Sequence, residues 1–336
     1  METRKLQKIG GSTYSVSLPK EWATEHRLEA GMPIHLYPHT DGSLVVRSAV
    51  QDGGPLSATT LSLSATDADT VSRALRAAYA VGYDTVTLVA PEDAELTAEE
   101  RRAVRRLVQT MVGMSVVEET TEYVTVENLL DASEVSIRQS VIQLQFTALS
   151  MHRTAVERVS RRVTDDAATD PLDDRDDEVD RLFEMITRHF NRSLADLGEI
   201  DDLDVRRPEL FDYYLVARQI ERVADHAVRI GAFADHAESV DDDLLAEVVA
   251  LAEAARGVVE TATTAVVEPS ADRAHEALDR RARVVDDVLA LDQTLFEQSQ
   301  PGAYALSRVL ASLGRTAECG GNVATVALRA SVRPEA

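Results

Sequence analysis

Glu221 and Asp225 are the residues whose type and spacing most clearly suggest chemistry. They lie in the segment 218–231, whose apolar residues recur at three- and four-residue steps and predict an amphipathic helix with one buried stripe. Four residues apart, the two carboxylates sit one helical turn from each other at the edge of that stripe, where like charges repel by about 0.2–0.5 kcal/mol in an isolated helix. A stable fold therefore favours a cation beside them, either a metal ion or an arginine.

The motif around these carboxylates is an aliphatic residue, Glu, Arg, an apolar residue, a small residue, Asp, a variable residue and Ala. It resembles the signature helix of the PhoU family of phosphate-signalling proteins. A weaker copy follows at 313–324, with Gly314 at the Glu position, Glu318 at the Asp position and Asn322 opposite Arg229. Proteins of that family are tandem three-helix bundles, so the resemblance implies an all-α C-terminal part made of two bundles, at 129–238 and 239–336.

The periodicity of the sequence agrees with that plan. Helical stripes run from Asp131 to the C-terminus, with breaks at the polar loop 164–174, at Pro208, at Pro269-Ser270 and at Pro301-Gly302. Three long helices with short connections predict an antiparallel bundle, and the pattern occurs twice. We expect the first helix to begin at Asp131 with a capping-box-like start, and the third to run from about residue 211 to 237.

In the PhoU family, acidic pairs on two helices of each bundle hold multinuclear iron or zinc. The resemblance therefore implies metal ligands in the first bundle at Asp176, Asp180, Glu221 and Asp225. Carboxylate oxygens from two facing helices can bridge divalent ions, with water completing each shell. The second bundle has lost the first acid of each pair, which leaves weaker candidates at Asp286, Glu318 and Asn322. The alternative is an exposed helix face in a protein with 58 acidic residues.

The first fifty residues predict a small β-rich module. Tyr14, Val16 and Leu18 alternate with serines as in a half-buried strand, and Asp41-Gly42 is a hairpin turn signal. Together with the Leu-Pro-Lys segment, this order resembles the SpoVT/AbrB DNA-binding domain, a swapped-hairpin fold that two chains build together. In that family basic residues of the first strand and loop contact DNA, which implies a DNA-binding patch of Arg4, Lys5, Lys8 and Lys20. Solvated surface cations, or a module that only dimerises, remain alternatives.

The net charge of −23 is unevenly distributed. Residues 1–50 hold six basic and five acidic side chains, or +1, whereas the remainder holds 29 basic and 53 acidic, or −24. A polyanion would therefore dock only at the N-terminal end. Scarce lysine with abundant aspartate is typical of proteins from salt-loving archaea. The single cysteine, Cys319, and the lack of an apolar segment after the N-terminus predict a cytoplasmic protein without a membrane insertion.

A Gly-Gly-Pro linker at 51–58 precedes a predicted α/β domain at 59–128 with the order β-α-β-α-β-β. A helix in it is expected to start at Thr97, with Glu100 completing a capping box. We identify no motif in this domain, so its role is open between a spacer and a sensing or dimerising module. Among other reactive side chains, we expect His152 on the apolar side of the first helix and Cys319 as a small buried residue. His226 and His236 could join the metal site, and surface positions on the third helix explain them as well.

The sequence thus favours a multidomain, non-enzymatic, homodimeric regulator of transcription that senses phosphate status through PhoU-like bundles and binds the operator of phosphate-related genes. The resemblance also implies a phosphate ABC transporter ATPase or a sensor kinase as partners. The first alternative is an adaptor that acts on such a transporter or kinase without binding DNA. The second is a di-metal carboxylate enzyme, which the absence of any Glu-x-x-His segment disfavours.

Overall fold

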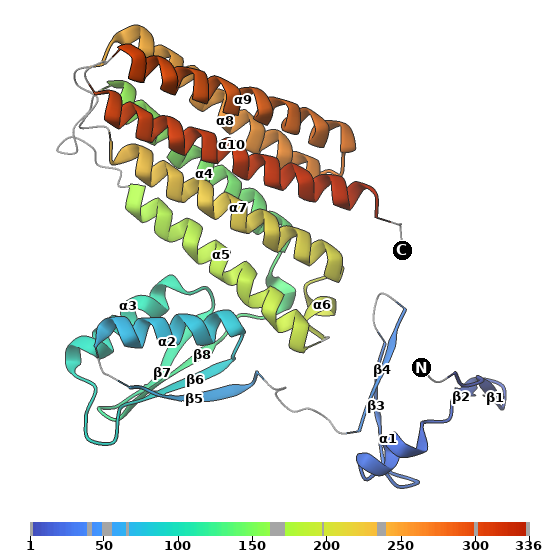
Figure 1. Ribbon diagram of the computed structural model, residues 1–336. Coiled ribbons are helices and arrows are strands. Elements are labelled where there is room, and N and C mark those ends of the chain that lie inside the picture. Colours follow the sequence, from blue (N-terminus) through green and yellow to red (C-terminus); the bar gives the residue numbers. More distant parts are fainter. Residues whose placement is uncertain are drawn as a thin grey trace. The chain divides into compact units, whose positions relative to one another are not determined.

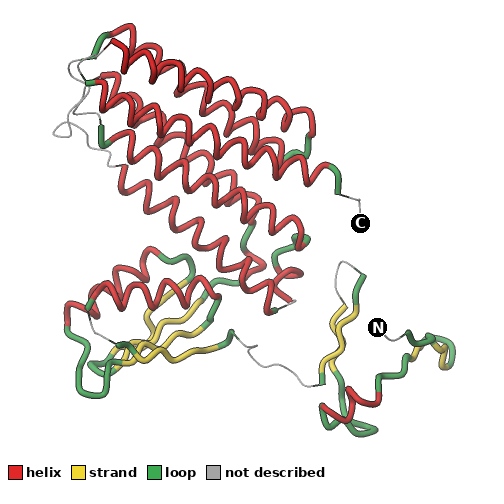
Figure 2. Tube along the Cα trace, viewed as in Figure 1, coloured by secondary structure: helices red, strands yellow, loops and turns green. Residues whose placement is uncertain are grey.

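The computed structural model describes residues 3–38, 42–48, 56–64, 67–161, 172–196, 198–233, 240–298 and 302–333 (Figures 1 and 2). The chain falls into two compact units, Met1–Gly54 and Pro55–Ala336, which are considered separately below. The predicted turn residue Asp41, the residues 51–55 of the predicted linker and His236 lie outside the described residues. The strand that follows the linker already begins at Ala58.

The N-terminal unit consists of short hairpins and one short helix. Strands β1 (Gln7–Ile9) and β2 (Thr13–Ser15) pair antiparallel, α1 spans Lys20–Glu25, and β3 (His35–Pro38) pairs antiparallel with β4 (Leu44–Arg47). No side chain in the described part of this unit is buried. More than half of the surface of several large apolar residues is exposed: Leu6, Ile9, Tyr14, Leu36 and Leu44. The described residues of this unit therefore form no hydrophobic core of their own.

The second unit begins with the predicted α/β region, which is confirmed. Its elements are β5 (Ala58–Ser62), α2 (Ala68–Val81), β6 (Thr85–Val89), α3 (Ala98–Thr110), β7 (Met114–Glu119) and β8 (Tyr123–Asn128). The sheet order is β5-β6-β8-β7, with β5 parallel to β6 and the other pairs antiparallel. The capping box of Thr97 and Glu100 is present as predicted. Both helices cover the sheet face that is turned toward α5 (Figure 1).

The C-terminal region is all-α, as predicted. A 3₁₀ turn, η1 (Ala132–Glu134), and a short helix, α6 (Gly198–Asp202), accompany the long helices α4 (Ile137–Arg161), α5 (Leu172–Ala195), α7 (Arg207–Gly231), α8 (Asp242–Val267), α9 (Ala271–Gln298) and α10 (Ala303–Ser331). Helices α4, α5 and α7 form one bundle, and α8, α9 and α10 form the other. Buried apolar residues of both bundles belong to one continuous core, in which α7 packs against α10 and α4 against α8.

Several predicted helix boundaries are wrong. Asp131 caps the 3₁₀ turn by accepting a hydrogen bond from the Ser133 backbone N–H, and α4 starts only at Ile137. The predicted loop 164–174 extends too far, because α5 already begins at Leu172. Helix α7 begins at Arg207 rather than near 211, because Pro208 fits the first helical turn, where its missing N–H is not needed. It ends at Gly231 rather than near 237.

The packing of α10 against α8 depends on a glycine. A Cβ atom added at Gly320 would lie 2.8 Å from Cγ1 of Val258 and 2.9 Å from the backbone nitrogen of Val259. The two helices thus approach more closely than any side chain at this position would permit. Within the described ranges, none of the helices combines the length and the apolar character needed to cross a bilayer.

Candidate functional site

The four predicted metal ligands of the first bundle lie on two helices that pack against each other. Asp176 and Asp180 occupy successive turns of α5, and Glu221 and Asp225 occupy successive turns of α7. The charge of Asp225 acts on all three of the other carboxyls, and that of Asp180 also acts on Glu221. The two pairs therefore act on each other electrostatically across the contact between α5 and α7. We call this set the acid cluster.

The acid cluster carries crowded, partly desolvated negative charge. Burial raises the pKa of Asp176 to about 6, and the charges of Asp180 and Asp225 add to the effect. Burial is also the main cause that raises the pKa of Asp180 and of Glu221. Such shifts mark sites where ionised carboxylates lack enough solvent or counter-charge, which a bound cation would supply.

Arginines supply part of that counter-charge. Arg229 lies 3.8 Å from Asp225, one turn away on α7. Arg76, on α2 of the α/β region, forms an ion pair with Glu184 on α5. Burial raises the pKa of Asp180 on balance, and the charge of Arg76 offsets part of that rise. Of the two cations that the sequence allowed beside the carboxylates, a metal ion or an arginine, arginines are therefore present at the edges of the cluster.

The donor chemistry of the cluster fits a hard cation such as a ferric or divalent metal ion. Oε2 of Glu221 is buried and has no hydrogen-bond partner, so an acceptor oxygen is available inside the cluster. As the side chains stand, no three of the described His, Cys, Asp and Glu residues are close enough together to hold a metal ion. Metal binding would therefore require these side chains to turn toward a common centre.

The second-repeat candidates have other partners. Glu318 forms an ion pair with Arg315 at 2.6 Å on the same helix. Asn322 donates a hydrogen bond of 3.0 Å to Oε1 of Gln219, across the contact between α10 and α7. Asp286 is exposed on α9. The structure thus engages Glu318 and Asn322 in contacts that a metal site would have to replace.

The predicted DNA-binding residues all lie on the surface of the N-terminal unit. Lys8 is on β1, Lys20 begins α1, and Arg4 and Lys5 precede β1. All four side chains are exposed. They are therefore accessible to a polyanion in the one unit whose charge would tolerate it.

The remaining predicted side chains divide into one correct pair and one error. His152 and Cys319 are buried, as expected, and burial raises the pKa of the Cys319 thiol to about 11. Of the two alternatives for His226, the surface position is wrong: the residue is only 6 % exposed, because α7 is covered by α10 as well as by the helices of its own bundle. Burial lowers the pKa of His226 to about 4, so this imidazole is neutral at pH 7.

A polar interface that the sequence analysis did not predict lies between α5 and the end of α2. Arg188 is 2 % exposed and donates hydrogen bonds to the carbonyls of Tyr79 and Tyr83, and its guanidinium lies 5.1 Å from the Tyr79 ring centroid. Arg192 donates to the carbonyl of Gly82, and both arginines pair with Asp84. Positive groups thus satisfy carbonyls at the C-terminus of α2, where the helix dipole favours them.

A buried acid completes this interface. Glu199 is 3 % exposed; Oε1 lies 2.5 Å from Nδ1 of His189, and Oε2 accepts a 2.9 Å bond from Arg192. Burial acts to raise the pKa of Glu199, but the bonds from His189 and Arg192 outweigh it and lower that pKa. The only signal in the sequence was the spacing of Arg188 and Arg192, four apart on one face of a helix.

Comparison with known proteins agrees with this division of the chain. Residues 141–234 match the family model of the PhoU domain, and residues 7–53 match that of the MazE bacterial antitoxin, described as antidote-toxin recognition. Among solved structures, the phosphate transport system regulatory protein PhoU from Streptococcus pneumoniae is 13 % identical, with 59 % of this chain and 97 % of that chain covered at a TM-score of 0.38. No curated protein matched the chain. By these matches, the N-terminal part of the chain is similar to the MazE antitoxin family, and the first helical bundle is similar to the PhoU domain.

Proposed function

We propose that this protein is a cytoplasmic, DNA-binding regulator of phosphate uptake that acts as a homodimer. The observation that carries the proposal is the combination of two parts: an N-terminal unit that carries exposed cations, no net negative charge and no core among its described residues, and an acidic remainder that matches the PhoU domain. The first half of that combination provides the contact with an operator. The second half provides the response to phosphate status.

Dimerisation follows from the exposure of apolar side chains in the N-terminal unit. A unit of this size stabilises itself mainly by burying apolar surface, at about 25 cal/mol per Å². Leu6, Tyr14 and Leu36 are each more than half exposed, and no described residue of the unit is buried. A second copy, with its hairpins exchanged as in the AbrB fold, would cover these side chains.

DNA binding is supported by charge and accessibility. Arg4, Lys5, Lys8 and Lys20 are exposed, and they lie in the part of the sequence with a charge of +1, whereas the remainder carries −24. Lysines offer point charges to phosphates, and only Arg4 offers a planar fork for a base edge. We therefore assign these residues mainly to phosphate contacts.

The acid cluster is proposed to bind iron or zinc through Asp176, Asp180, Glu221 and Asp225. When bound, the metal would supply the positive charge that the crowded carboxylates lack. The α/β region is proposed to connect the PhoU domain with the N-terminal unit. A phosphate ABC transporter ATPase or a sensor kinase is the kind of partner that the PhoU domain implies, and no enzymatic activity is part of the proposal.

A gel-shift assay tests the DNA-binding half. The probe is the region upstream of the protein's own operon or of phosphate-transport genes, at the salt concentration native to the protein, because phosphate contacts weaken as salt rises. The wild-type protein should shift the probe, and a variant with Arg4, Lys5 and Lys8 changed to Glu should not. A control with the same charge change at exposed arginines of the second unit, Arg106, Arg308 and Arg329, separates a local contact from the loss of overall charge.

The second candidate function is an adaptor whose N-terminal unit only dimerises. The exposed apolar residues of that unit favour it equally, because they require a partner copy but not DNA. Sedimentation of the Arg4, Lys5 and Lys8 variant beside the gel shift distinguishes the two. A wild-type dimer that shifts none of the probes would support the adaptor and contradict the regulator.

A further inference from the structure

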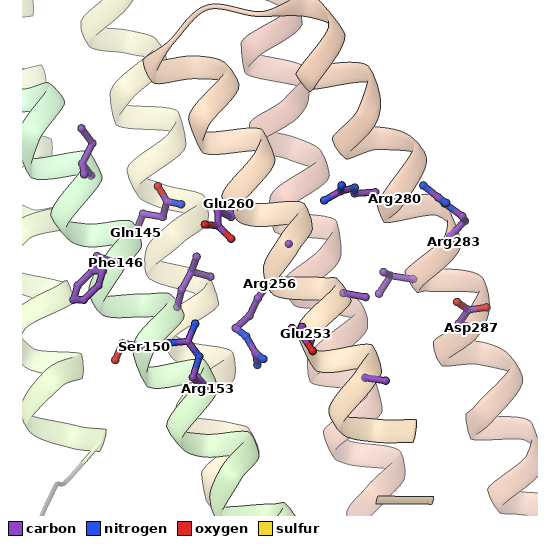
Figure 3. A pocket seen from close by; sticks show the side chains of 16 residues that line it. Gln145, Phe146, Ser150, Arg153, Glu253, Arg256, Glu260, Arg280, Arg283 and Asp287 are labelled. Carbon is purple, nitrogen blue, oxygen red and sulfur yellow. The ribbon is translucent and has the colours of Figure 1, made fainter. Parts of the chain in front are cut away.

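A groove of about 1000 Å³ lies between α4, α8 and α9, and no function discussed so far uses it (Figure 3). Its polar lining residues are Gln145, Ser150 and Arg153 of α4, Glu253, Arg256 and Glu260 of α8, and Arg280, Arg283 and Asp287 of α9. The apolar wall includes Phe146, whose side chain is 76 % exposed. The groove thus offers both charged and aromatic surface.

The residues that line the groove carry a small net positive charge, whereas the whole chain is strongly negative. Four arginines and three acids line it, whereas the whole protein has 35 basic and 58 acidic residues. Two of these arginines have other partners: Arg280 forms a 2.6 Å ion pair with Glu276, and Arg283 donates to the backbone carbonyl of Asp279. The other two arginines, Arg153 and Arg256, form no such ion pair or backbone contact among the described residues.

Arg153 and Arg256 form a pair of like charges without an acidic partner. Among the described residues, neither has a carboxylate oxygen within the 4.0 Å of an ion pair. Their side chains extend into the same space between α4 and α8 (Figure 3). Burial and the charge of Arg153 lower the pKa of Arg256, while Glu253 and Glu157 act more weakly in the opposite direction.

A buried histidine holds one of the two guanidiniums in place. Nη1 of Arg256 lies 3.4 Å from Nδ1 of His152, which is 0 % exposed. Burial lowers the pKa of His152 to about 3, so this imidazole is neutral at pH 7 and Nδ1 can accept the bond. Arg256 is thus positioned before any ligand arrives, which reduces the entropy lost on binding.

We propose that Arg153 and Arg256 bind the phosphoryl group of a small ligand. Guanidinium forks match the tetrahedral oxygens of phosphate, and charge-assisted bonds of this kind are about twice as strong as neutral ones. The groove is large enough for an esterified phosphate, and Phe146 lies on the same helix as Arg153, two turns away, as a surface for a flat organic group. Free phosphate and a nucleotide are the two sources to be distinguished. The site goes beyond the proposed function, and it stands whether or not the N-terminal unit binds DNA.

Isothermal titration of the full-length protein with inorganic phosphate and, separately, with adenosine monophosphate tests the proposal. The protein is first treated with EDTA, so that metal at the acid cluster cannot bind the phosphate. Arg153→Gln and Arg256→Gln should each weaken binding at least about tenfold, which corresponds to about 1.4 kcal/mol. Arg308→Gln, an exposed arginine of α10 outside the groove, is the matched control and should leave the affinity unchanged. Phe146→Ala should weaken binding of the nucleotide but not of free phosphate.

Absence of binding by the wild-type protein with both ligands would overturn the proposal. So would binding that Arg153→Gln and Arg256→Gln leave within twofold of wild type, or that Arg308→Gln weakens equally. Circular dichroism checks the fold of each variant. If Arg256→Gln unfolds, Arg153→Gln decides alone, because Arg153 is exposed and its loss should not disturb packing.

Discussion

Replacing Asp176 by asparagine should stabilise the metal-free protein at pH 8 and change its stability little at pH 4. Burial, Asp180 and Asp225 raise the pKa of Asp176 from 3.8 to about 6 in the folded state. The folded state therefore holds this proton more tightly than the unfolded state does. Stability falls as the pH rises from about 4 to about 6, and above that range the ionised carboxylate imposes its full cost.

The size of the effect follows from the pKa values. A rise from 3.8 to about 6 corresponds to about 3 kcal/mol, at about 1.4 kcal/mol per pKa unit. Asp176 is partly exposed, so solvent screening reduces this figure to about 1–2 kcal/mol. Asparagine keeps the shape of the side chain and removes the charge, which should restore that amount at pH 8.

Urea unfolding in EDTA at pH 4, 6 and 8 measures this prediction. The free energy of unfolding of Asp176→Asn minus that of wild type should be small at pH 4 and grow to its full value by pH 8. Asp286→Asn is the matched control, since it removes the same charge from an exposed position on α9. A pH-independent difference, or an equal gain from Asp286→Asn, would refute the idea that crowding in the acid cluster destabilises the metal-free protein.

Four further predictions concern packing and reactivity. Arg188→Met should destabilise the protein by about 3–5 kcal/mol, because it removes a buried guanidinium that donates to the carbonyls of Tyr79 and Tyr83 and pairs with Asp84, and hydrogen exchange should show the loss of protection first at the end of α2. Gly320→Ala should cost about 1–3 kcal/mol in urea unfolding, because its Cβ would overlap Val258. Gly314→Ala, whose Cβ would lie an ordinary 3.5 Å from its nearest neighbour, should instead stabilise α10 by up to about 1 kcal/mol. Cys319 is 3 % exposed with a pKa raised to about 11 by burial, so a thiol reagent at pH 8 should label it only as fast as the protein unfolds.

Elements that depend on local pattern were predictable from the sequence. The capping box at Thr97 and the α/β order follow from short-range spacing, and both are present. The electrostatic coupling of Asp176 and Asp180 to Asp225 follows from helical register once the two helices are known to be neighbours. These features need no knowledge of distant contacts.

Features set by contacts between distant segments were not predictable. The burial of His226 depends on α10 covering a face of α7 that one bundle alone would leave in solvent. The capping of α2 by Arg188 depends on two segments 105–109 residues apart in the sequence. Pro208 predicts a junction because proline breaks helices in general, whereas the structure places it in the first turn of α7, where proline is tolerated.

Helix α5 contributes to two parts of the molecule at once. Near its start it carries Asp176 and Asp180, and near its end Arg188 and Arg192 hold the last carbonyls of α2. Between them, Glu184 receives Arg76 from the same α2 helix. If α5 shifts when the carboxylates are occupied, its contacts with α2 must adjust as well, because both sets of residues belong to one helix. The sheet region that α2 covers would then respond to a charge several helical turns away.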